Sequence, residues 1–288
     1  MTYTPRAVAG MLGVAPTTLR TWDQRYGLGP SLRTDGGHRR YEDADVEVLR
    51  RMVVLTGQGV AASSAAVLAR HEPQARPSLA LTPLTSADAL AARRSFLAAA
   101  KRLDEPMMSD VAGRLIIDHG VVAAWETVFV PALVELGELV AETGQGVEIE
   151  HLASGSVLFA LREIPRASSP GVLSALLACA PDEQHWLPLE ALGAALSEQG
   201  RMWRNLGARV PADALYDAVT RLRPAVALIW AHRPDLASRV PLEELGARPG
   251  TVVAVAGAGW DGLALPSFVH RPATLTEAIR LVVDRTGT

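Results

Sequence analysis

Residues 33–41, RTDGGHRRY, concentrate positive charge around one tight turn. Three arginines, a histidine and a tyrosine flank the Asp35-Gly36-Gly37 step. Arginine guanidinium groups bind phosphate oxygens, and Asp-Gly and Gly-Gly steps accept the positive φ that a tight hairpin turn requires. The segment therefore predicts a hairpin whose arms present arginines to a phosphate backbone.

Charge is distributed unevenly along the 288 residues. Residues 1–41 hold six arginines and two aspartates, a net charge of +4, whereas the whole chain carries −3 and the remainder therefore −7. A basic N-terminal module on an acidic body is typical of proteins that bind nucleic acid. An arginine-rich loop alone is more often a solvated surface, so this interpretation depends on the elements around it.

The other chemistry-bearing residues form short local patterns. Glu183-Gln184-His185 follows an apolar run that ends near Cys179, the single cysteine, which we interpret as a buried structural thiol. Residues 257–262 match GxGxxG, but they follow the fourth predicted strand, whereas a dinucleotide fingerprint opens the first βαβ unit. The sequence shows no nucleophile–base–acid arrangement and no clustered metal-ligand spacing beyond the isolated His185.

A helix-turn-helix is predicted immediately before the arginine-rich hairpin. The first helix begins at Thr4-Pro5, Gly13-Val14 interrupts it, and a second helix begins near Pro16. Leu19, Trp22 and Tyr26 recur at spacings of three and four, which predicts that they hold the second helix to its core. A hairpin beside such a motif is a wing. We predict that DNA contacts come from Thr17, Thr18, Arg20, Arg25, Tyr26, Arg33, His38, Arg39, Arg40 and Tyr41.

The remaining segments predict a multidomain α and α/β chain. Helices at 42–60 and 61–71 complete the first domain, 1–71, and a proline- and serine-rich linker covers 72–86. Domain 87–168 reads as a four-helix bundle, with Ser86 as the first cap, a second helix near 107–118, and Pro131 marking a kink or junction in the third.

Domain 169–288 alternates strands with helices, which predicts a doubly wound, flavodoxin-like parallel sheet. We expect strands near 171–180, 201–208, 225–231 and 251–257, with a short fifth strand at 268–270. A capping box at Thr274–Glu277 begins the last helix.

Residues 4–60 resemble the DNA-binding domain of the MerR family of transcription regulators. The motifs LRTWDQRYG and RTDGGHRRY most resemble its CarH-like branch, the cobalamin-dependent light-responsive repressors. The bundle and sheet are similar in layout to the cobalamin-binding unit of that branch. The resemblance implies a regulator that binds double-stranded DNA. A single winged module buries little DNA surface, so we expect a homo-oligomer. The single cysteine and the lack of an apolar run of about 20 residues favour the cytoplasm. The C-terminal region would then act as a sensor or oligomerisation module, with no membrane involved.

The resemblance also implies a cobalamin motif, acid-x-His-x-x-Gly, at Glu183 and His185. The histidine of that motif is the lower axial cobalt ligand, oriented by the acid, and it would be a metal ligand here only if cobalamin binds. This sequence has Pro188 where the motif has glycine. A surface histidine in a loop is the alternative interpretation.

Other cofactor positions of the branch are altered or ambiguous. Glu150-His151 matches a Glu-His pair near the upper face of the cofactor, although such a helical pair is usually a packed polar pair. The Trp-His that lies ten residues earlier in the branch is replaced by Val140-Ala141, so its capping and light-state roles cannot be carried over.

Bulky residues also stand where the family leaves room for the nucleotide tail of cobalamin. Trp230 ends the third strand in place of a small serine motif, and Trp260 follows Gly257 and Gly259, where a Gly-Gly pair is usual. The two indoles could fill the tail site, line a pocket for another flat ligand, or point into the core.

We therefore expect a regulator that is not an adenosylcobalamin photoreceptor and whose cofactor is unknown, with cobalamin disfavoured and another small-molecule ligand left open. The first alternative is a cobalamin-dependent regulator that uses His185. The second is a cobalamin- or nucleotide-dependent enzyme, but no residues remain for a large substrate domain, so we predict that the chain is not an enzyme.

Overall fold

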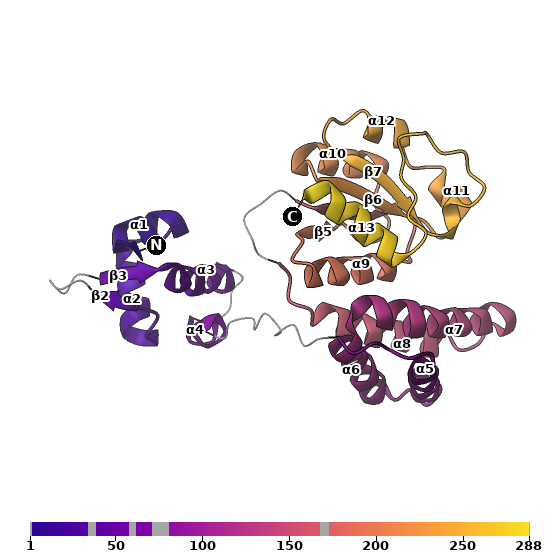
Figure 1. Cartoon of the computed structure of the whole chain (residues 1–288), viewed down its shortest axis with the longest axis horizontal. Helices are drawn as coiled ribbons and strands as arrows, with labels where there is room; N and C mark the ends of the chain where they lie inside the picture. The colour runs from indigo at the N-terminus through magenta and orange to yellow at the C-terminus, as the bar shows by residue number, and fades with distance from the viewer. Residues whose placement is uncertain (1, 34–38, 58–61, 71–80, 168–172, 288) are drawn as a thin grey trace. The chain divides into compact units, whose positions relative to one another are not determined.

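The computed structural model describes residues 2–33, 39–57, 62–70, 81–167 and 173–287, and the chain forms two compact units, 1–78 and 79–288 (Figure 1). The predicted turn at Asp35-Gly36-Gly37, together with His38 and most of the predicted linker, lies outside the described residues. The predicted boundaries at 71, 86 and 168 stay predictions.

The N-terminal unit contains the predicted helix-turn-helix and the two arms of the wing. Its elements are β1 (Thr2–Tyr3), α1 (Pro5–Leu12), α2 (Pro16–Tyr26), β2 (Leu32–Arg33), β3 (Arg39–Glu42), α3 (Asp43–Gly57) and α4 (Ala62–Arg70). Thr4 caps α1 through its hydroxyl oxygen, and Gly13 ends it with φ 66°, which permits the tight turn into α2. The antiparallel sheet has the order β1-β3-β2, so an unpredicted N-terminal strand supports the wing.

The bundle follows the predicted helices with longer and more irregular bounds. It comprises α5 (Ser86–Lys101), α6 (Glu105–Ala124), the π-helical turn η1 (Trp125–Phe129), α7 (Val130–Thr143) and α8 (Val147–Arg162). The prediction that Ser86 is a cap was wrong by one residue, because Thr85 accepts the hydrogen bond from the Asp88 amide and Ser86 is already helical. The junction predicted near Pro131 is confirmed, because this residue lies in the first turn of α7, directly after η1.

Gly120 interrupts α6 with φ 82°, a conformation outside the helical region. The break frees the Val121 amide, and the Glu198 carboxylate accepts its hydrogen bond at 3.1 and 3.2 Å. A residue of the sheet domain thus caps a helix of the bundle.

The predicted parallel sheet is present with four strands. Its elements are β4 (Ala175–Cys179), α9 (Leu187–Glu198), β5 (Trp203–Asn205), α10 (Ala212–Leu222), β6 (Val226–Trp230), α11 (Pro234–Ala237), α12 (Leu242–Gly246), β7 (Val252–Ala256), the 3₁₀ turn η2 (Ala258–Trp260) and α13 (Leu275–Thr286). The strand order is β5-β4-β6-β7, all parallel. The fifth strand predicted at 268–270 was wrong, because only His270 pairs, in one bridge to Ala254.

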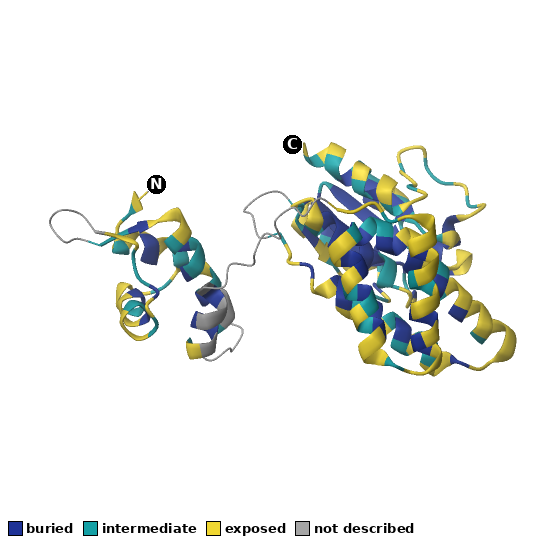
Figure 2. Ribbon diagram, turned by 60° about the horizontal axis from the view of Figure 1, so that its bottom comes forward, coloured by how far each residue is buried: buried dark blue, intermediate teal, exposed yellow. Residues whose placement is uncertain are grey.

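Alternate residues of the strands face opposite layers of helices, as a doubly wound sheet requires. The strands of this sheet are mostly coloured as buried in Figure 2. Leu176 and Ala178 pack with α10, α11 and α12, whereas Leu177 and Cys179 pack with α9 and α13. The sheet is therefore buried on both faces.

Helix α9 belongs to two cores at once. Ala191, Ala194 and Ala195 pack into the bundle core, whereas Leu189 and Leu192 pack against the sheet. The bundle and the sheet therefore share a helix.

A charged link joins the bundle to the sheet beside α9. Arg162 of α8 lies 3.5 Å from the buried Glu190 carboxylate, which also accepts a 2.9 Å hydrogen bond from Asn205. The Arg162 guanidinium stands over the Trp186 ring. These contacts connect α8 to the helix that the bundle core and the sheet core share.

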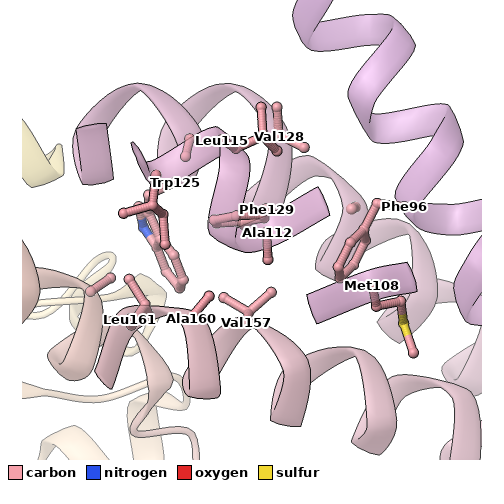
Figure 3. Packing of buried hydrophobic residues seen from close by; sticks show 14 of the residues in the cluster. Phe96, Met108, Ala112, Leu115, Trp125, Val128, Phe129, Val157, Ala160 and Leu161 are labelled. Carbon is pink, nitrogen blue, oxygen red and sulfur yellow. The ribbon is translucent and has the colours of Figure 1, made fainter. Parts of the chain in front are cut away.

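The bundle core combines many alanines with a few large side chains, and Figure 3 shows Phe129 facing α8 between Trp125 and Phe96. The stretch Glu105–Thr143, which includes the break at Gly120, is apolar and long enough to cross a membrane by length and composition alone. In the structure its buried side chains fill this core instead, as expected of a core helix in a bundle.

We predict that Phe129→Ala lowers the free energy of unfolding of the C-terminal unit by about 3–5 kcal/mol, because Phe129 is fully buried and its removal leaves a cavity. Chemical denaturation of the full chain would measure this. Phe159→Ala is the matched control, since that ring is 60% exposed and its loss should have little effect. Equal losses for both variants would contradict the packing described.

Candidate functional site

The exposed face of α2 carries the polar residues predicted to contact DNA. Thr17, Arg20 and Arg25 are exposed, as are Thr21 and Gln24. Leu19 and Trp22 are buried on the opposite face. Helical spacing therefore gathers hydroxyl, amide and guanidinium groups on one side, the groups that read base edges and bind phosphates. Thr18 and Tyr26 are half-buried, and Tyr26 packs partly against the core, at the margin of this face.

The wing brings arginines close to this helix. Strands β2 and β3 pair with Leu32 opposite Arg40 and Arg33 opposite Arg39. Arg40 donates a hydrogen bond to the carbonyl of Arg39 at 3.1 Å, and it forms no ion pair among the described residues. The Arg33 side chain and His38 lie outside what the structure describes.

Arg39 is engaged by α2 itself. Its Nη2 atom lies 2.9 Å from Oδ2 of Asp23, and both side chains are largely buried. Sequence reasoning placed Arg39 among the phosphate contacts and did not consider Asp23. The pairing could not be read from the sequence, because it depends on where the wing folds back onto the helix.

Tyr41 was expected at the DNA surface, and its burial contradicts this. The side chain is fully buried in the N-terminal core, and its hydroxyl has no hydrogen-bond partner among the described residues. Burial raises the pKa of its phenol. Tyr41 alternates with Arg40 on a two-faced strand, so one points outward and the other into the core.

The base of the wing is held by one carboxylate of α3. Oδ2 of Asp45 accepts hydrogen bonds from the Ser31 amide and hydroxyl at 2.9 and 2.8 Å and from the Glu42 amide at 2.8 Å. The start of β2 and the end of β3 are therefore tied to the same atom.

The second site lies at the carboxyl end of the parallel sheet, where the loop after β4 carries Glu183 and His185. Glu183 is 1% exposed. Its Oε1 accepts hydrogen bonds from the His185 amide at 2.9 Å and the His185 Nδ1 at 2.7 Å, and its Oε2 accepts one from the His232 amide at 2.7 Å. One buried carboxylate thus fixes the loops that follow β4 and β6.

Two opposing effects act on the pKa of Glu183. Burial raises it, but the hydrogen bonds from His185 and His232 favour the charged form and outweigh burial, so the pKa is lowered. An ionised Glu183 accepts a hydrogen bond, so the Nδ1 nitrogen of His185 is the donor in this contact and the carboxylate fixes the orientation of the ring. The His185 side chain is 64% exposed.

His232 is a residue of this site that sequence reasoning missed. Its ring centroid lies 4.8 Å from that of His185, with the planes tilted by 46°. It follows β6 as His185 follows β4, and the carboxyl ends of adjacent parallel strands meet at one edge. Because the ends of adjacent parallel strands meet, His232 could have been identified from the sequence as a neighbour of His185.

Glu150 and His151 form a local polar pair on α8. Ser154 donates a 2.9 Å hydrogen bond to Glu150, and His151 Nε2 lies 3.7 Å from the same carboxylate while its side chain stays 75% exposed. These contacts are those of a polar pair on a helix, the alternative to a contact with the upper face of a cofactor.

The two indoles lie on opposite faces of the sheet, so they do not line one pocket. Trp230 packs with the α9 and α13 layer, whereas Trp260 is buried with the α10 to α12 layer. The indole nitrogens of both are buried without a hydrogen-bond partner among the described residues. Added β-carbons at Gly257 and Gly259 would meet the backbone of Ala231 and Arg233, so these glycines allow close packing of two loops.

Cys179 is buried, and burial, followed by the charge of Glu183, raises the pKa of its thiol to about 12. Such a thiol is inert at neutral pH. Among the described ranges, no group of three or more His, Cys, Asp or Glu side chains is arranged to hold a metal ion.

The helix-turn-helix, its antiparallel wing and the polar face of α2 define a winged-helix protein that binds DNA. Family comparison agrees: the model of the MerR HTH family regulatory protein matches residues 3–72.

Two curated relatives extend the match over most of the chain. The chain is 34% identical over 228 residues to the HTH-type transcriptional repressor CarH of Myxococcus xanthus, covering 77% of this chain and 76% of that one. It is 30% identical over 266 residues to the repressor CarA of the same organism, covering 90% and 88%. The chain therefore belongs to the MerR family of DNA-binding transcription regulators, in the group related to CarH and CarA. Its relatives are regulators, which confirms that it is not an enzyme.

A solved structure shows the fold of the C-terminal region. The monomethylamine corrinoid protein of Methanosarcina barkeri is similar with a TM-score of 0.53 at 11% identity, covering 68% of this chain and 98% of that protein. The predicted cobalamin-binding-like fold is confirmed at this level.

We predict that stability falls as the pH drops below about 4.5, the ordinary pKa of glutamate, in part because Glu183 must be protonated. The folded pKa is lowered, so its contribution is complete above the unfolded pKa and is lost as the pH falls through the folded pKa. Glu183→Gln should cost about 1.5–3 kcal/mol at pH 7 and less at pH 3.5.

Urea denaturation at the two pH values would measure this difference, with Glu150→Gln as a control that should cost little at either. A Glu183→Gln effect that is independent of pH would contradict the assignment of an ionised carboxylate.

Proposed function

We propose that this regulator recognises specific duplex sequences with α2, holds phosphates with the wing, and uses residues 79–288 as a sensor or oligomerisation module. The observation that carries the proposal is the exposed polar face of α2 beside Arg40. The N-terminal net charge of +4 supports it, because phosphate neutralisation supplies much of the affinity for DNA.

We further propose that the chain works as a homo-oligomer in the cytoplasm, where its DNA targets lie. A single winged module buries little DNA surface, so dimers or larger assemblies on repeated half-sites would be needed for tight binding. Linkage then provides regulation, because any ligand that favours one assembly changes the apparent affinity for DNA.

The C-terminal residues fit only one of the requirements of cobalamin. Glu183 and His185 fit, because the carboxylate orients the imidazole through Nδ1 and most of the His185 side chain is exposed. Trp230 does not, because its indole packs on the α9 face at the end of the third strand, where related sheets leave space for the nucleotide tail. We therefore propose that the chain is not an adenosylcobalamin photoreceptor, and the proposed mechanism does not require this cofactor.

The cobalamin-dependent regulator remains the second candidate, since the Glu183–His185 geometry favours it. The cofactor would need Trp230 to change its packing. A different ligand could use the same exposed imidazole without that rearrangement.

We predict that binding to duplex DNA weakens steeply with salt and that Arg40→Ala weakens it similarly for all sequences. Losing one phosphate contact should reduce the slope of log affinity against log salt by about one. Arg20→Ala should instead alter sequence preference, because Arg20 lies on the exposed face of α2. Fluorescence anisotropy on selected and random duplexes would measure both effects. An unchanged salt slope for Arg40→Ala would contradict the role of the wing.

We predict that the purified chain does not retain stoichiometric adenosylcobalamin after mixing in the dark and desalting. The visible spectrum before and after illumination would report binding and photolysis, and DNA binding would be measured on the same samples. The opposite result, retention that His185→Ala abolishes together with light-dependent DNA release, would establish the second candidate.

A further inference from the structure

We propose that Asp23 is a positioning residue for DNA binding: through Arg39 it locks the wing against α2 and so sets the spacing between base-reading and phosphate-binding side chains. This inference rests on the proposed DNA interface of α2 and the wing. It reassigns Arg39 from phosphate contact to structural partner.

Two observations define the lock. The Arg39 guanidinium approaches Asp23 at 2.9 Å, with side-chain exposures of 27% and 22%. The chain at Gly29 passes so close to Asp23 that an added β-carbon would overlap the carboxylate. The carboxylate is thus held between the backbone after α2 and the first residue of β3.

The position of Asp23 on α2 also needs a physical explanation. Asp23 lies on the helix expected to enter the groove, where an unpaired carboxylate would repel phosphates. Pairing with Arg39 neutralises that charge. The same pairing occupies Arg39, so Arg40 is the wing arginine that forms no ion pair among the described residues.

The lock acts at the end of the wing strand opposite its base. Asp45 fixes Ser31 and Glu42, the ends of the strands nearest α3, while Arg39 begins β3 beside the turn. Without the Asp23 contact, the described part of the wing would keep its contacts at Tyr41 and Asp45 but lose the one that holds Arg39, so the arginines would move relative to Thr17 and Arg20. Specific binding needs both sets of contacts in register, whereas binding to random DNA does not.

The experiment compares five variants of the chain, four single and one double, on two duplexes, one selected by the wild-type chain from a random pool and one of random sequence. Asp23→Ala removes the acceptor, and Arg39→Ala removes the donor. Gly29→Ala displaces the carboxylate without changing charge, at a glycine whose φ does not require glycine. Arg40→Ala is the matched control, because it leaves the Asp23–Arg39 pair intact.

We expect Asp23→Ala and Gly29→Ala to lower the ratio of specific to random affinity by about tenfold, while random binding is kept or increased. Arg39→Ala should lower the same ratio without changing the salt slope. The Asp23→Ala/Arg39→Ala double variant should lose no more specificity than either single variant. Arg40→Ala should reduce both affinities together. Thermal unfolding of each variant verifies that the domain remains folded.

An unchanged specificity ratio in folded Asp23→Ala and Gly29→Ala variants would overturn the proposal. So would a reduced salt slope in Arg39→Ala, which would make Arg39 a phosphate contact. Failure of the proposed function is a separate outcome, since the wild-type chain would then enrich no sequence from the pool.

Discussion

The burial of Leu19 and Trp22 beneath α2 is the constraint on which the DNA-binding surface depends. These two side chains pack with Val8, Leu49 and Met52, and they fix the rotation of the helix about its axis. Because the helical period is 3.6 residues, the polar side chains on the opposite face of α2 must then face solvent. The wing is built on the same core, since Tyr41 inserts into it from β3 and thereby places Arg40 on the outside. Apolar packing thus decides which groups can meet DNA.

In the C-terminal unit, buried polar groups hold together the loops at the carboxyl end of the parallel sheet. Glu183 ties the loops after β4 and β6 together, while Glu198 and Glu190 connect the bundle to the sheet through Val121 and Arg162. A helix shared between two cores makes relative sliding of bundle and sheet costly, because close-packed interfaces do not deform continuously.

Sequence reasoning predicted the features that depend on local periodicity and turn chemistry. The helix-turn-helix followed from Thr4, Gly13 and the spacing of Leu19 and Trp22, and the doubly wound sheet followed from alternating apolar runs. It misassigned Tyr41, because a four-residue strand is too short for its alternation to show which face is buried. It also missed contacts made across the fold.

Long-range pairings such as Asp23 with Arg39 and Glu183 with the His232 amide depend on register and loop approach, which single-sequence patterns do not contain. For a related reason, the sequence did not show that α9 packs in both the bundle core and the sheet core. A helix that is apolar almost all round indicates burial but does not reveal its partners.

Chemical interference on DNA bound by the full chain tests the central claim, that α2 reads the major groove while the wing holds the backbone. DNA carrying guanines methylated at N7, a major-groove atom, or phosphates ethylated along both strands would be sorted into bound and unbound molecules. Modifications that block binding would then be found in the unbound DNA. The account predicts a short stretch in which N7 methylation prevents binding, flanked by phosphates whose ethylation also prevents it. Interference from ethylated phosphates alone, with no sensitive base in the major groove, would contradict it.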